Sequence, residues 1–361
     1  MRSPNEATSL CHSCPKLCRY SCPVADADRN EATTPQAKMS TMRLIEQKRL
    51  PKTEETLGLA YKCLNCRASQ NACEMENPVS ATLDTYRVEA FRAGLAPEGV
   101  FSYGRRFQKE NNPFQIDLQK RLRHFPASVR KRKRTIYFPG CTEIAKSPQT
   151  IQKTLELFEE LQPKEIGLYD EPIQCCGYPL FVAGDQERFV ELAEINSHAL
   201  RESQMILSGA PACLYTMQTL YRSVGHPVGA QFLHVTEFLS DLLKKSVFKG
   251  RKKERPTAAY HDPCYLGRYR KVYEPPRKII EAATGVAPKE FFHNRETSNC
   301  SGAGGLLPVS YPETAAKITR NRIEEFRQTG ADVLVTSCPT CVQRFQKFDV
   351  PAQNLIDYIK G

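Results

Sequence analysis

The chain has 361 residues, 40% of them hydrophobic, and a formal net charge of +11. This length allows two or three domains with cores of their own. No apolar run approaches the roughly 20 residues of a membrane-spanning helix, and the first residues lack the apolar core of a signal peptide. We therefore expect a soluble cytoplasmic protein without a transmembrane helix. Thiols stay reduced in that compartment, so the 15 cysteines favour metal ligation over disulfides.

Residues 1–100 carry two cysteine motifs separated by a segment of helical composition. In Thr34 to Thr56, the residues Met39, Met42 and Ile45 have helical spacing, which predicts a helix. The long interval between the motifs is typical of a helical ferredoxin domain rather than a compact β-type ferredoxin. We therefore expect an all-α domain over residues 1–100.

The first motif, Cys11-x2-Cys14-x3-Cys18-x3-Cys22-Pro23, comes within one residue of the bacterial ferredoxin run. Three thiolates of such a run hold one cluster, and the fourth crosses to the neighbouring cluster. The second motif has the same frame with a serine in its third position: Cys63, Cys66, Ser69 and Cys73. The crossover rule predicts one cluster on Cys11, Cys14, Cys18 and Cys73, and another on Cys22, Cys63 and Cys66.

The second set lacks a fourth thiolate. The Ser69 oxygen can complete it as an accessory ligand, the site can hold a three-iron cluster, or another ligand can join. Zinc is the main alternative metal, since Cys-x2-Cys pairs also form tetrahedral zinc sites. The Cys22-Pro23 ending favours iron–sulfur clusters, and a zinc-stabilised interaction scaffold stays open as an alternative.

Residues 101–134 form a basic linker, most strongly charged from Arg121 to Arg134. A second basic segment runs from Lys249 to Arg255. Both can be solvated connectors, and the first can dock on an acidic partner or an anionic membrane face. Apart from Phe125, no aromatic residues are interleaved with these charges, so we do not expect nucleic-acid binding.

Residues 135–250 and 251–361 repeat one order of strands and helices. In the first lobe we expect a strand from Thr135, a helix Ile151 to Leu161, a strand Ile166 to Tyr169, a helix Asp185 to Leu207, and a strand or turn Ala210 to Tyr215. In the second we expect strands Thr257 to Tyr260, Lys289 to Phe292 and Asp332 to Thr336, with helices Pro276 to Thr284 and Pro312 to Thr329. This alternation predicts α/β lobes with largely parallel strands.

The two lobes also repeat a cysteine pattern. The first set is Cys141, Cys175, Cys176 and Cys213, and the second is Cys264, Cys300, Cys338 and Cys341. Each set follows predicted strands, and open α/β sheets bind ligands beyond the carboxyl ends of their strands. We expect each set to hold an iron–sulfur cluster.

These sets and their flanks, such as Phe138 to Cys141, His261 to Arg268 and Ser301 to Gly305, resemble the cysteine-rich CCG domains. Such domains occur in heterodisulfide reductase B- and D-type subunits, and in the iron–sulfur subunits of glycolate oxidase, anaerobic glycerol-3-phosphate dehydrogenase and lactate-utilisation complexes. The resemblance implies a helical ferredoxin domain followed by two duplicated α/β lobes. It also implies [4Fe–4S] clusters, two in the N-terminal domain (one of them [3Fe–4S] if the second set stays incomplete) and one or two in the lobes.

The same resemblance implies an electron-transfer subunit with a flavin-dependent dehydrogenase as its partner. A membrane-bound quinone or cytochrome partner would hold the chain at the inner face of the membrane. A complete CCG motif has five cysteines, and in heterodisulfide reductases it holds a noncubane cluster. Each set here has four, with Thr216 and Ser301 in the missing positions, so disulfide reduction is the alternative.

Two further features flank the second set. His261 and Asp262 are expected to shape the loop before Cys264, with His261 as an accessory ligand position or a proton donor in the alternative reading. The glycines of Ser301 to Gly305 do not follow a nucleotide-binding pattern. We expect them to let backbone N–H groups approach cluster sulfurs.

Overall fold

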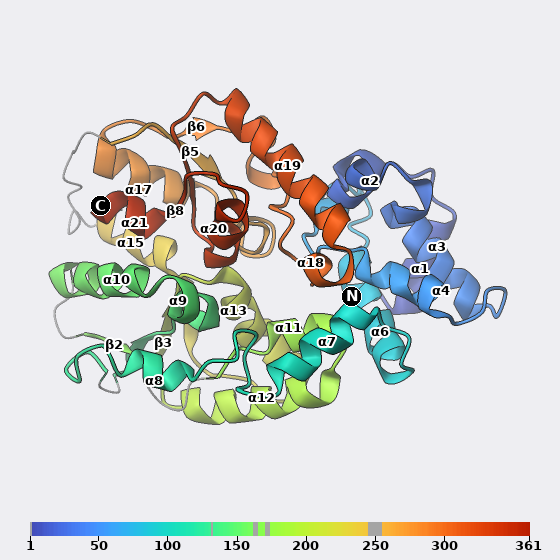
Figure 1. Cartoon of the computed structure of the whole chain (residues 1–361), viewed down its shortest axis with the longest axis horizontal. Coiled ribbons are helices and arrows are strands. Elements are labelled where there is room, and N and C mark those ends of the chain that lie inside the picture. The colour runs from blue at the N-terminus through green and yellow to red at the C-terminus, as the bar shows by residue number, and fades with distance from the viewer. Residues whose placement is uncertain (1, 131–132, 162–164, 170–173, 245–254) are drawn as a thin grey trace. The chain divides into compact units, whose positions relative to one another are not determined.

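The computed structural model describes the whole chain except residues 1, 131–132, 162–164, 170–173 and 245–254 (Figure 1). The chain forms two compact units. The first unit comprises Met1–Arg106, Pro179–Glu187 and His293–Glu325, and the second comprises Phe107–Tyr178, Arg188–Phe292 and Phe326–Gly361. Both predicted lobes therefore fall mainly in the second unit, and each gives one segment to the first. The four-part division expected from the sequence stays a prediction.

The described residues of the first unit form helices and turns without a strand. Its N-terminal helices are α1 Pro4–His12, α2 Pro23–Asp28, α3 Pro35–Glu46, α4 Glu54–Gly58, α5 Ala68–Asn71, α6 Val79–Arg92 and α7 Glu98–Phe107. The inserted segments add most of α11 Tyr178–Ala183, then α18 Leu307–Ser310 and most of α19 Pro312–Gln328. The predicted helix from Thr34 to Thr56 is only partly right, because α3 ends at Glu46 and α4 starts anew at Glu54.

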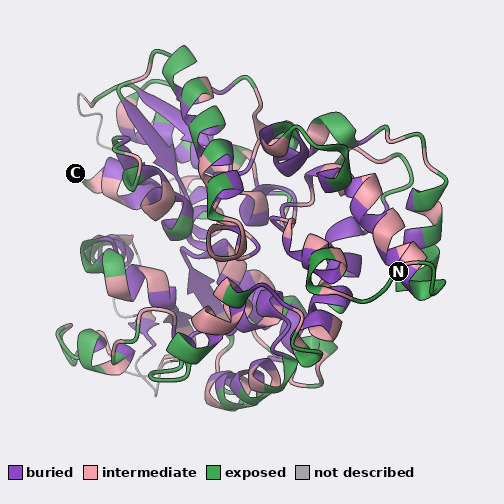
Figure 2. Cartoon of the chain, turned by 45° about the vertical axis from the view of Figure 1, so that its right-hand side comes forward, coloured by how far each residue is buried: buried purple, intermediate pink, exposed green. Residues whose placement is uncertain are grey.

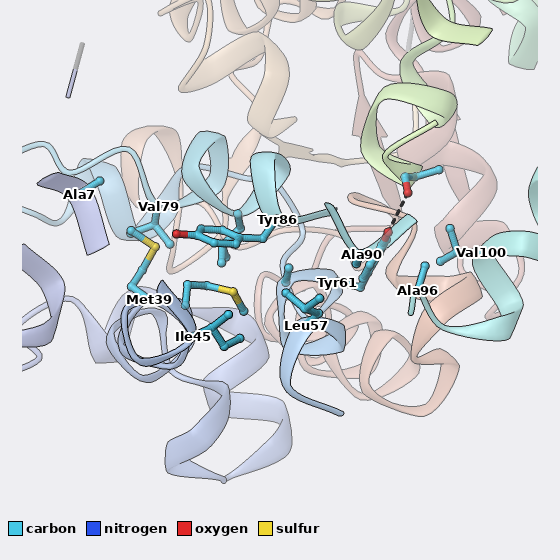
Figure 3. Packing of buried hydrophobic residues seen from close by; sticks show 14 of the residues in the cluster. Ala7, Met39, Ile45, Leu57, Tyr61, Val79, Tyr86, Ala90, Ala96 and Val100 are labelled. Atoms are coloured by element: carbon cyan, nitrogen blue, oxygen red, sulfur yellow. Dashed lines mark hydrogen bonds between the residues drawn. The ribbon is translucent and has the colours of Figure 1, made fainter. Parts of the chain in front are cut away.

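Local sequence explains where these helices begin. Ser3 and Glu6 form a capping box at the start of α1, and Thr34 accepts from the Ala37 N–H at the start of α3, with Pro35 in its first turn. Met39 and Ile45 of α3 pack into the apolar core shown in Figure 3.

Several other helices contribute to this core, including α1 through Ala7 and α7 through Val100. Tyr86 of α6 and Leu57 of α4 lie within it. The Tyr61 hydroxyl donates to the Ala183 carbonyl at 2.8 Å, which ties the inserted α11 segment to this core (Figure 3).

The second unit contains two parallel sheets of four strands each. The first consists of β1 Thr135–Tyr137, β2 Ile166–Leu168, β3 Met205–Ser208 and β4 Gln231–His234, in the order β2-β1-β3-β4. The second consists of β5 Ala258–His261, β6 Lys289–Glu290, β7 Val333–Thr336 and β8 Ala352–Asn354, in the order β6-β5-β7-β8. The two orders are equivalent, which confirms the α/β lobes with parallel strands, and the inner strands are buried (Figure 2).

Helices connect and cover these strands. In the first lobe they are α9 Gly140–Lys146, α10 Pro148–Leu161, α12 Gln186–Leu200, α13 Pro211–Tyr215, α14 Tyr221–Ser223 and α15 Val235–Lys244. In the second they are α16 Cys264–Gly267, α17 Glu274–Thr284, α20 Pro339–Gln346 and α21 Leu355–Lys360. Strands β2 and β3 lie on opposite sides of β1, and β6 and β7 lie on opposite sides of β5, so the strand order reverses at these points. Each sheet therefore has a switch point at its carboxyl edge.

Two element predictions in the first lobe are wrong. The predicted helix Asp185 to Leu207 ends at Leu200, and Met205–Ser208 forms β3 in register with Thr135–Tyr137 of β1. A short apolar run does not distinguish a buried strand from a helix turn. The expected strand or turn at Ala210 to Tyr215 is the helix α13, which Pro211 starts.

The basic linker is partly described. It contains α8 Leu118–Leu122, whose first turn is capped by Asp117. Lys131 and Arg132 lie outside the described residues, as does the second basic segment apart from Arg255. Within the described part of the chain, no helix is both long and apolar enough to cross a membrane.

Candidate metal centres

The loop that follows α1 gathers a first group of four thiols. Cys11 lies in α1, and Cys14 and Cys18 follow in the turn that leads to α2. The Cys11 thiol interacts electrostatically with those of Cys14, Cys18 and Cys73, and the Cys18 thiol with those of Cys14, Cys22 and Cys73. The four residues that the crossover rule assigns to one cluster are therefore near one another, with Cys22 also close to Cys18, and their ligation of one cluster stays a prediction. Burial raises the pKa of Cys11 to about 12 and that of Cys18 to about 11, so metal binding must displace their protons.

Asn77 supplies a hydrogen bond to this first group. Its Nδ2 donates to the Cys11 sulfur at 2.9 Å and to the Ala7 carbonyl at 2.9 Å, and the residue is 1% exposed. Donors aimed at a ligating sulfur stabilise the thiolate and tune a bound metal. The motif spacing gave no signal for Asn77, since a partner of this kind is defined only by the fold.

A small cavity in the first unit is lined by the residues that the crossover rule assigns to the second cluster. Cys22 lies at the start of α2, Cys63 and Cys66 lie in the loop before α5, and Ser69 lies in α5. The buried Lys38 of α3 lines the same cavity. Three thiols and one hydroxyl therefore line this space, and their ligation of a cluster stays a prediction.

The loop around Cys66 has an unusual backbone. Asn65 and Arg67 on either side of Cys66 have left-handed φ angles of 52° and 57°. Such residues are costly unless surrounding contacts hold them. The Asn65 Nδ2 donates to both carboxylate oxygens of Asp84, at 2.8 and 2.9 Å, and burial raises the pKa of Asp84 to about 6. This buried pair fixes the loop that carries Cys66.

Arg87 of α6 holds the backbone of Cys63. Its guanidinium is fully buried and donates to the Cys63 carbonyl at 2.6 Å, the Ala60 carbonyl at 3.0 Å and the Val182 carbonyl at 3.2 Å. The Asp84 carboxylate lies 3.6 Å from it and compensates its charge. The position of Cys63 is therefore set by a buried ion pair and not by the loop alone.

The glycines after Cys300 pack against the same segment. A Cβ at Gly305 would lie 2.1 Å from the Cys63 carbonyl oxygen, and one at Gly304 would lie 2.4 Å from the Leu64 carbonyl oxygen. The close approach of two backbones explains why side chains are absent here. The expected role of these glycines near cluster sulfurs stays a prediction, since the contacts that the structure shows are with the backbone that carries Cys63.

The first lobe brings its four cysteines into direct contact. The sulfurs of Cys141 and Cys175 are 3.5 Å apart. Hydrogen bonds from the Cys175 and Cys213 thiols, together with the Tyr178 backbone N–H, hold the pKa of Cys176 well below its usual value. The shared hydrogen bond to Cys176 raises the pKa of Cys213. All four thiols are buried, beyond the carboxyl ends of β1 and β3.

Thr216 occupies the position of the missing fifth cysteine. Its hydroxyl is in hydrogen-bond contact with the Cys176 sulfur and with the Ala212 carbonyl, the latter at 2.8 Å. It also opens a π-helical turn, Thr216–Leu220, a type of distortion that is frequent at functional sites. The residue at the fifth position therefore still contacts the cysteine sulfurs, but it offers a hydroxyl oxygen in place of a thiol.

A buried carboxyl accompanies the first set. Glu143 is 1% exposed, accepts from the Tyr137 hydroxyl at 2.6 Å and interacts electrostatically with Cys213. Burial raises the pKa of Glu143 to about 8. Gly209 makes room for it, because a Cβ there would lie 2.6 Å from its Oε1. Glu143 was not predicted from the sequence, where its only signal is its place two residues after Cys141.

The second set is divided between the two units. Cys264 starts α16 after β5, and Cys338 and Cys341 lie at the start of α20 after β7. These three belong to the second unit, whereas Cys300 belongs to the first. Cys300, Cys338 and Cys341 are buried, and Cys264 is half-buried. Ligation by this set stays a prediction.

His261 and Asp262 have structural contacts. The His261 ring packs against Phe345 and Phe291, with ring centroids 5.1 and 6.1 Å apart. The Asp262 carboxylate accepts two hydrogen bonds of 2.8 Å from the guanidinium of Arg277. These contacts agree with a role in shaping the loop before Cys264, and His261 as an accessory ligand stays a prediction.

Four tyrosines of the second unit pack together near the cysteines. Tyr265 and Tyr269 stack with centroids 4.1 Å apart, Tyr215 meets Tyr269 edge-on at 4.7 Å, and the Tyr178 and Tyr265 hydroxyls are 2.8 Å apart. Tyr178, Tyr215 and Tyr265 each follow a candidate ligand by one or two residues. This aromatic group was also missed from the sequence.

The donor sets fit iron–sulfur clusters in their chemistry. They consist of buried thiols with N–H donors at sulfur, from Asn77 to Cys11 and from the Tyr178 backbone to Cys176. Within the described ranges, no group of three or more histidine, cysteine, aspartate and glutamate side chains is arranged to hold a single metal ion. The case for metal binding rests on which thiols come together and not on a coordination geometry.

Comparison with known proteins agrees with this arrangement. Residues 135–218 and 258–346 each match the CCG family, described as a cysteine-rich domain. The chain carries two copies of the CCG cysteine-rich domain. Each copy ends just beyond its last candidate ligand position, Thr216 in the first and Cys341 in the second.

Relatives of this CCG chain carry iron–sulfur names. The D-type polypeptide of the dihydromethanophenazine:CoB--CoM heterodisulfide reductase of Methanosarcina acetivorans is 28% identical over 325 residues, which cover 84% of this chain and 78% of that protein. The probable iron-sulfur-binding oxidoreductase FadF of Bacillus subtilis is 24% identical, over 80% of this chain and 43% of FadF. The B-type polypeptide of the fumarate reductase (CoM/CoB) of Methanothermobacter marburgensis is 27% identical, over 78% of this chain and 55% of that protein. The chain spans about half the length of the last two. It is related to iron–sulfur oxidoreductase subunits, and these names support iron–sulfur binding.

Proposed function

We propose that this CCG chain is an iron–sulfur electron-transfer subunit of a multi-subunit oxidoreductase. It receives electrons from a flavin-dependent dehydrogenase and passes them toward a quinone, a cytochrome or another carrier. The observation that carries the proposal is the crossover in the first unit. Cys73 is near Cys11 and Cys18, and Cys22, although also near Cys18, lines the cavity of Cys63 and Cys66, which supports the ligand exchange of a two-cluster ferredoxin.

The chain's own residues would do two things for bound clusters. The cysteine sets supply thiolates, and buried donors such as Asn77 and the Tyr178 N–H orient and polarise them. Iron–sulfur clusters, when bound, supply one-electron carriers whose potentials depend on charge, hydrogen bonds and exposure. Hydride chemistry belongs to cofactors such as flavins, for which no motif occurs in this sequence, so substrate oxidation is assigned to a partner.

Anaerobic purification of the full chain, with iron and sulfide counting and electron paramagnetic resonance, tests the proposal. About twelve to sixteen irons per chain support clusters in both the first unit and the lobes, and about eight support only the ferredoxin pair. Stoichiometric zinc without sulfide would refute the redox function and support a zinc-stabilised scaffold.

Disulfide reduction is a second candidate, supported by the heterodisulfide reductase relative and by the contact of Thr216 with the Cys176 sulfur. In this reaction two electrons and two protons cleave one S–S bond and give two thiols. Reduced viologen dye and an organic disulfide provide the assay. Dye oxidation that depends on the disulfide and disappears in Cys176→Ser supports this candidate. If an iron-loaded chain still reduces a cytochrome but shows no disulfide-dependent dye oxidation, this candidate is refuted and electron transfer is the function that remains.

A further inference from the structure

A buried lysine forms part of the wall of the second N-terminal cavity. Lys38 is 1% exposed and lines this cavity together with the four candidate ligand residues. Its ammonium donates a hydrogen bond of 2.6 Å to the Lys62 carbonyl. Apolar residues such as Pro35 and Val79 also line the cavity, together with the half-buried Arg67 and the buried Ser80. The ammonium is itself buried, and charge interactions are strong where water is excluded.

This lysine has no carboxylate to balance it. Three other buried cations each have one within 4.0 Å: Arg87 with Asp84 at 3.6 Å, Arg277 with Asp262 at 2.8 Å, and Arg322 with Glu325 at 2.7 Å. Across the residues that the structure describes, no acidic side chain lies within ion-pair distance of Lys38. A buried charge without a counter-ion is strongly unfavourable, so its presence indicates an anion that occupies this cavity.

The groups that share the cavity can supply that anion. Burial raises the pKa of the Cys63 thiol, and the charge of Lys38 acts against this shift. A cluster held by the Cys22, Cys63 and Cys66 thiolates is anionic. The cavity therefore combines soft anionic ligands with one buried cation and leaves one ligand position to the Ser69 hydroxyl.

We propose that Lys38 is the counter-ion of the second N-terminal cluster and raises its reduction potential. Reduction adds one electron, and hence one negative charge, next to the ammonium, so Lys38 stabilises the reduced form more than the oxidised form. This role rests on the proposed function, since it needs a cluster in the cavity. Lys38 is a positioning and charge-setting residue, and it is not proposed as a ligand.

Redox titration of the full chain, purified anaerobically and followed by electron paramagnetic resonance, tests this role. The signal of the second cluster is the one that Cys66→Ser removes. We expect Lys38→Met to make its reduction at least about tenfold less favourable, a potential about 59 mV lower. The first cluster keeps its potential. Lys38→Arg retains the charge. In this variant the equilibrium constant for reduction of the second cluster should stay within about threefold of the wild-type value.

Lys278→Met is the matched control. Lys278 is exposed on α17, so this variant removes the same charge from the surface and should shift neither cluster. A second cluster that forms in Lys38→Met with an unshifted potential overturns the role of Lys38. Wild-type protein that takes up no iron refutes the proposed function instead.

A stability measurement covers the case in which Lys38→Met loses the second cluster. If Lys38 is a counter-ion, its uncompensated buried charge destabilises the cluster-free protein. Cluster-free Lys38→Met should then unfold at a higher urea concentration than cluster-free wild type. If Lys38 serves only to bond the Lys62 carbonyl, the variant should unfold at lower urea. That second result overturns the inference.

Discussion

Replacing Gly305 by alanine tests how the second N-terminal site is built. Gly305 has a φ of +61°, and a Cβ there would lie 2.1 Å from the Cys63 carbonyl oxygen and 3.0 Å from two backbone atoms of Leu64. All three neighbours are backbone atoms, so no side-chain rotation relieves the overlap. The substitution must displace either the glycine loop or the Cys63 segment.

Gly94→Ala provides the matched comparison. Gly94 has a φ of +70°, and a Cβ there would meet nothing within 4 Å. The left-handed backbone costs roughly 1–2 kcal/mol for an L-residue at either position. The difference between the two variants therefore isolates the overlap, and we expect Gly305→Ala to lower the free energy of unfolding of the first unit by about 3 kcal/mol more than Gly94→Ala.

Hydrogen exchange in increasing urea, under anaerobic conditions, measures this difference. Peptides from α3 and α6 report on the first unit, which avoids treating a two-unit chain as a single transition. Iron content should also fall in Gly305→Ala, because Cys63 is displaced. If the two variants agree within about 0.5 kcal/mol, the reasoning about this backbone contact is wrong.

Three other predictions concern the remaining sites. Ser69→Cys supplies the missing thiolate, so a three-iron resonance signal should disappear, and its persistence would contradict the ligand assignment. Burial lowers the pKa of His234 to about 3, so the neutral ring is favoured in the folded state. The unfolded chain binds a proton at this histidine below about pH 6.5, whereas the folded chain does so only near pH 3. The free energy of unfolding should therefore fall by up to about 5 kcal/mol as the pH drops through this range. His234→Gln should flatten the fall of urea midpoint over that range, and an unchanged slope would argue against it. Arg277→Met removes the guanidinium that pairs with the buried Asp262 carboxylate and should cost about 3–5 kcal/mol. Calorimetry checks this, and a loss below about 1 kcal/mol would contradict a buried pair.

The sequence predicted the parts of the sites that depend on local spacing. The cysteine motifs predicted the grouping of thiols in the first unit, because crossing over is a property of the motif itself, and the proximity of Cys73 to Cys11 and Cys18 agrees with it. Which thiols share a cluster stays a prediction. The parallel lobes were also predictable, since strands and helices alternate along the chain. Within them, β3 was missed because Met205 to Ser208 is too short a run for its period to be read.

The residues that surround the thiols could not be predicted. Lys38 reaches the Cys63 cavity only through packing of α3. Glu143 and three of the tyrosines stand close to cysteines in the sequence, but their burial and mutual contacts appear only in the fold. Nothing in a single sequence distinguishes the buried Lys38 from the exposed lysines on other helices. The inserted segment from His293 to Glu325 is a similar case, because its attachment to the N-terminal helices depends on close backbone contacts at Gly304 and Gly305.

The discontinuity of the first unit has a consequence for how the protein is made. A ribosome delivers the N-terminal cysteines first, and domains tend to fold in that order. The stretch that packs against the Cys63 carbonyl is synthesised long after Cys63 itself, when Gly305 has been added. Iron supplied to a shorter nascent chain would meet an unfinished site, so we expect cluster insertion to follow the synthesis of Gly305. In a chain truncated before residue 305, the Cys63 loop would lack its backbone contact with Gly305.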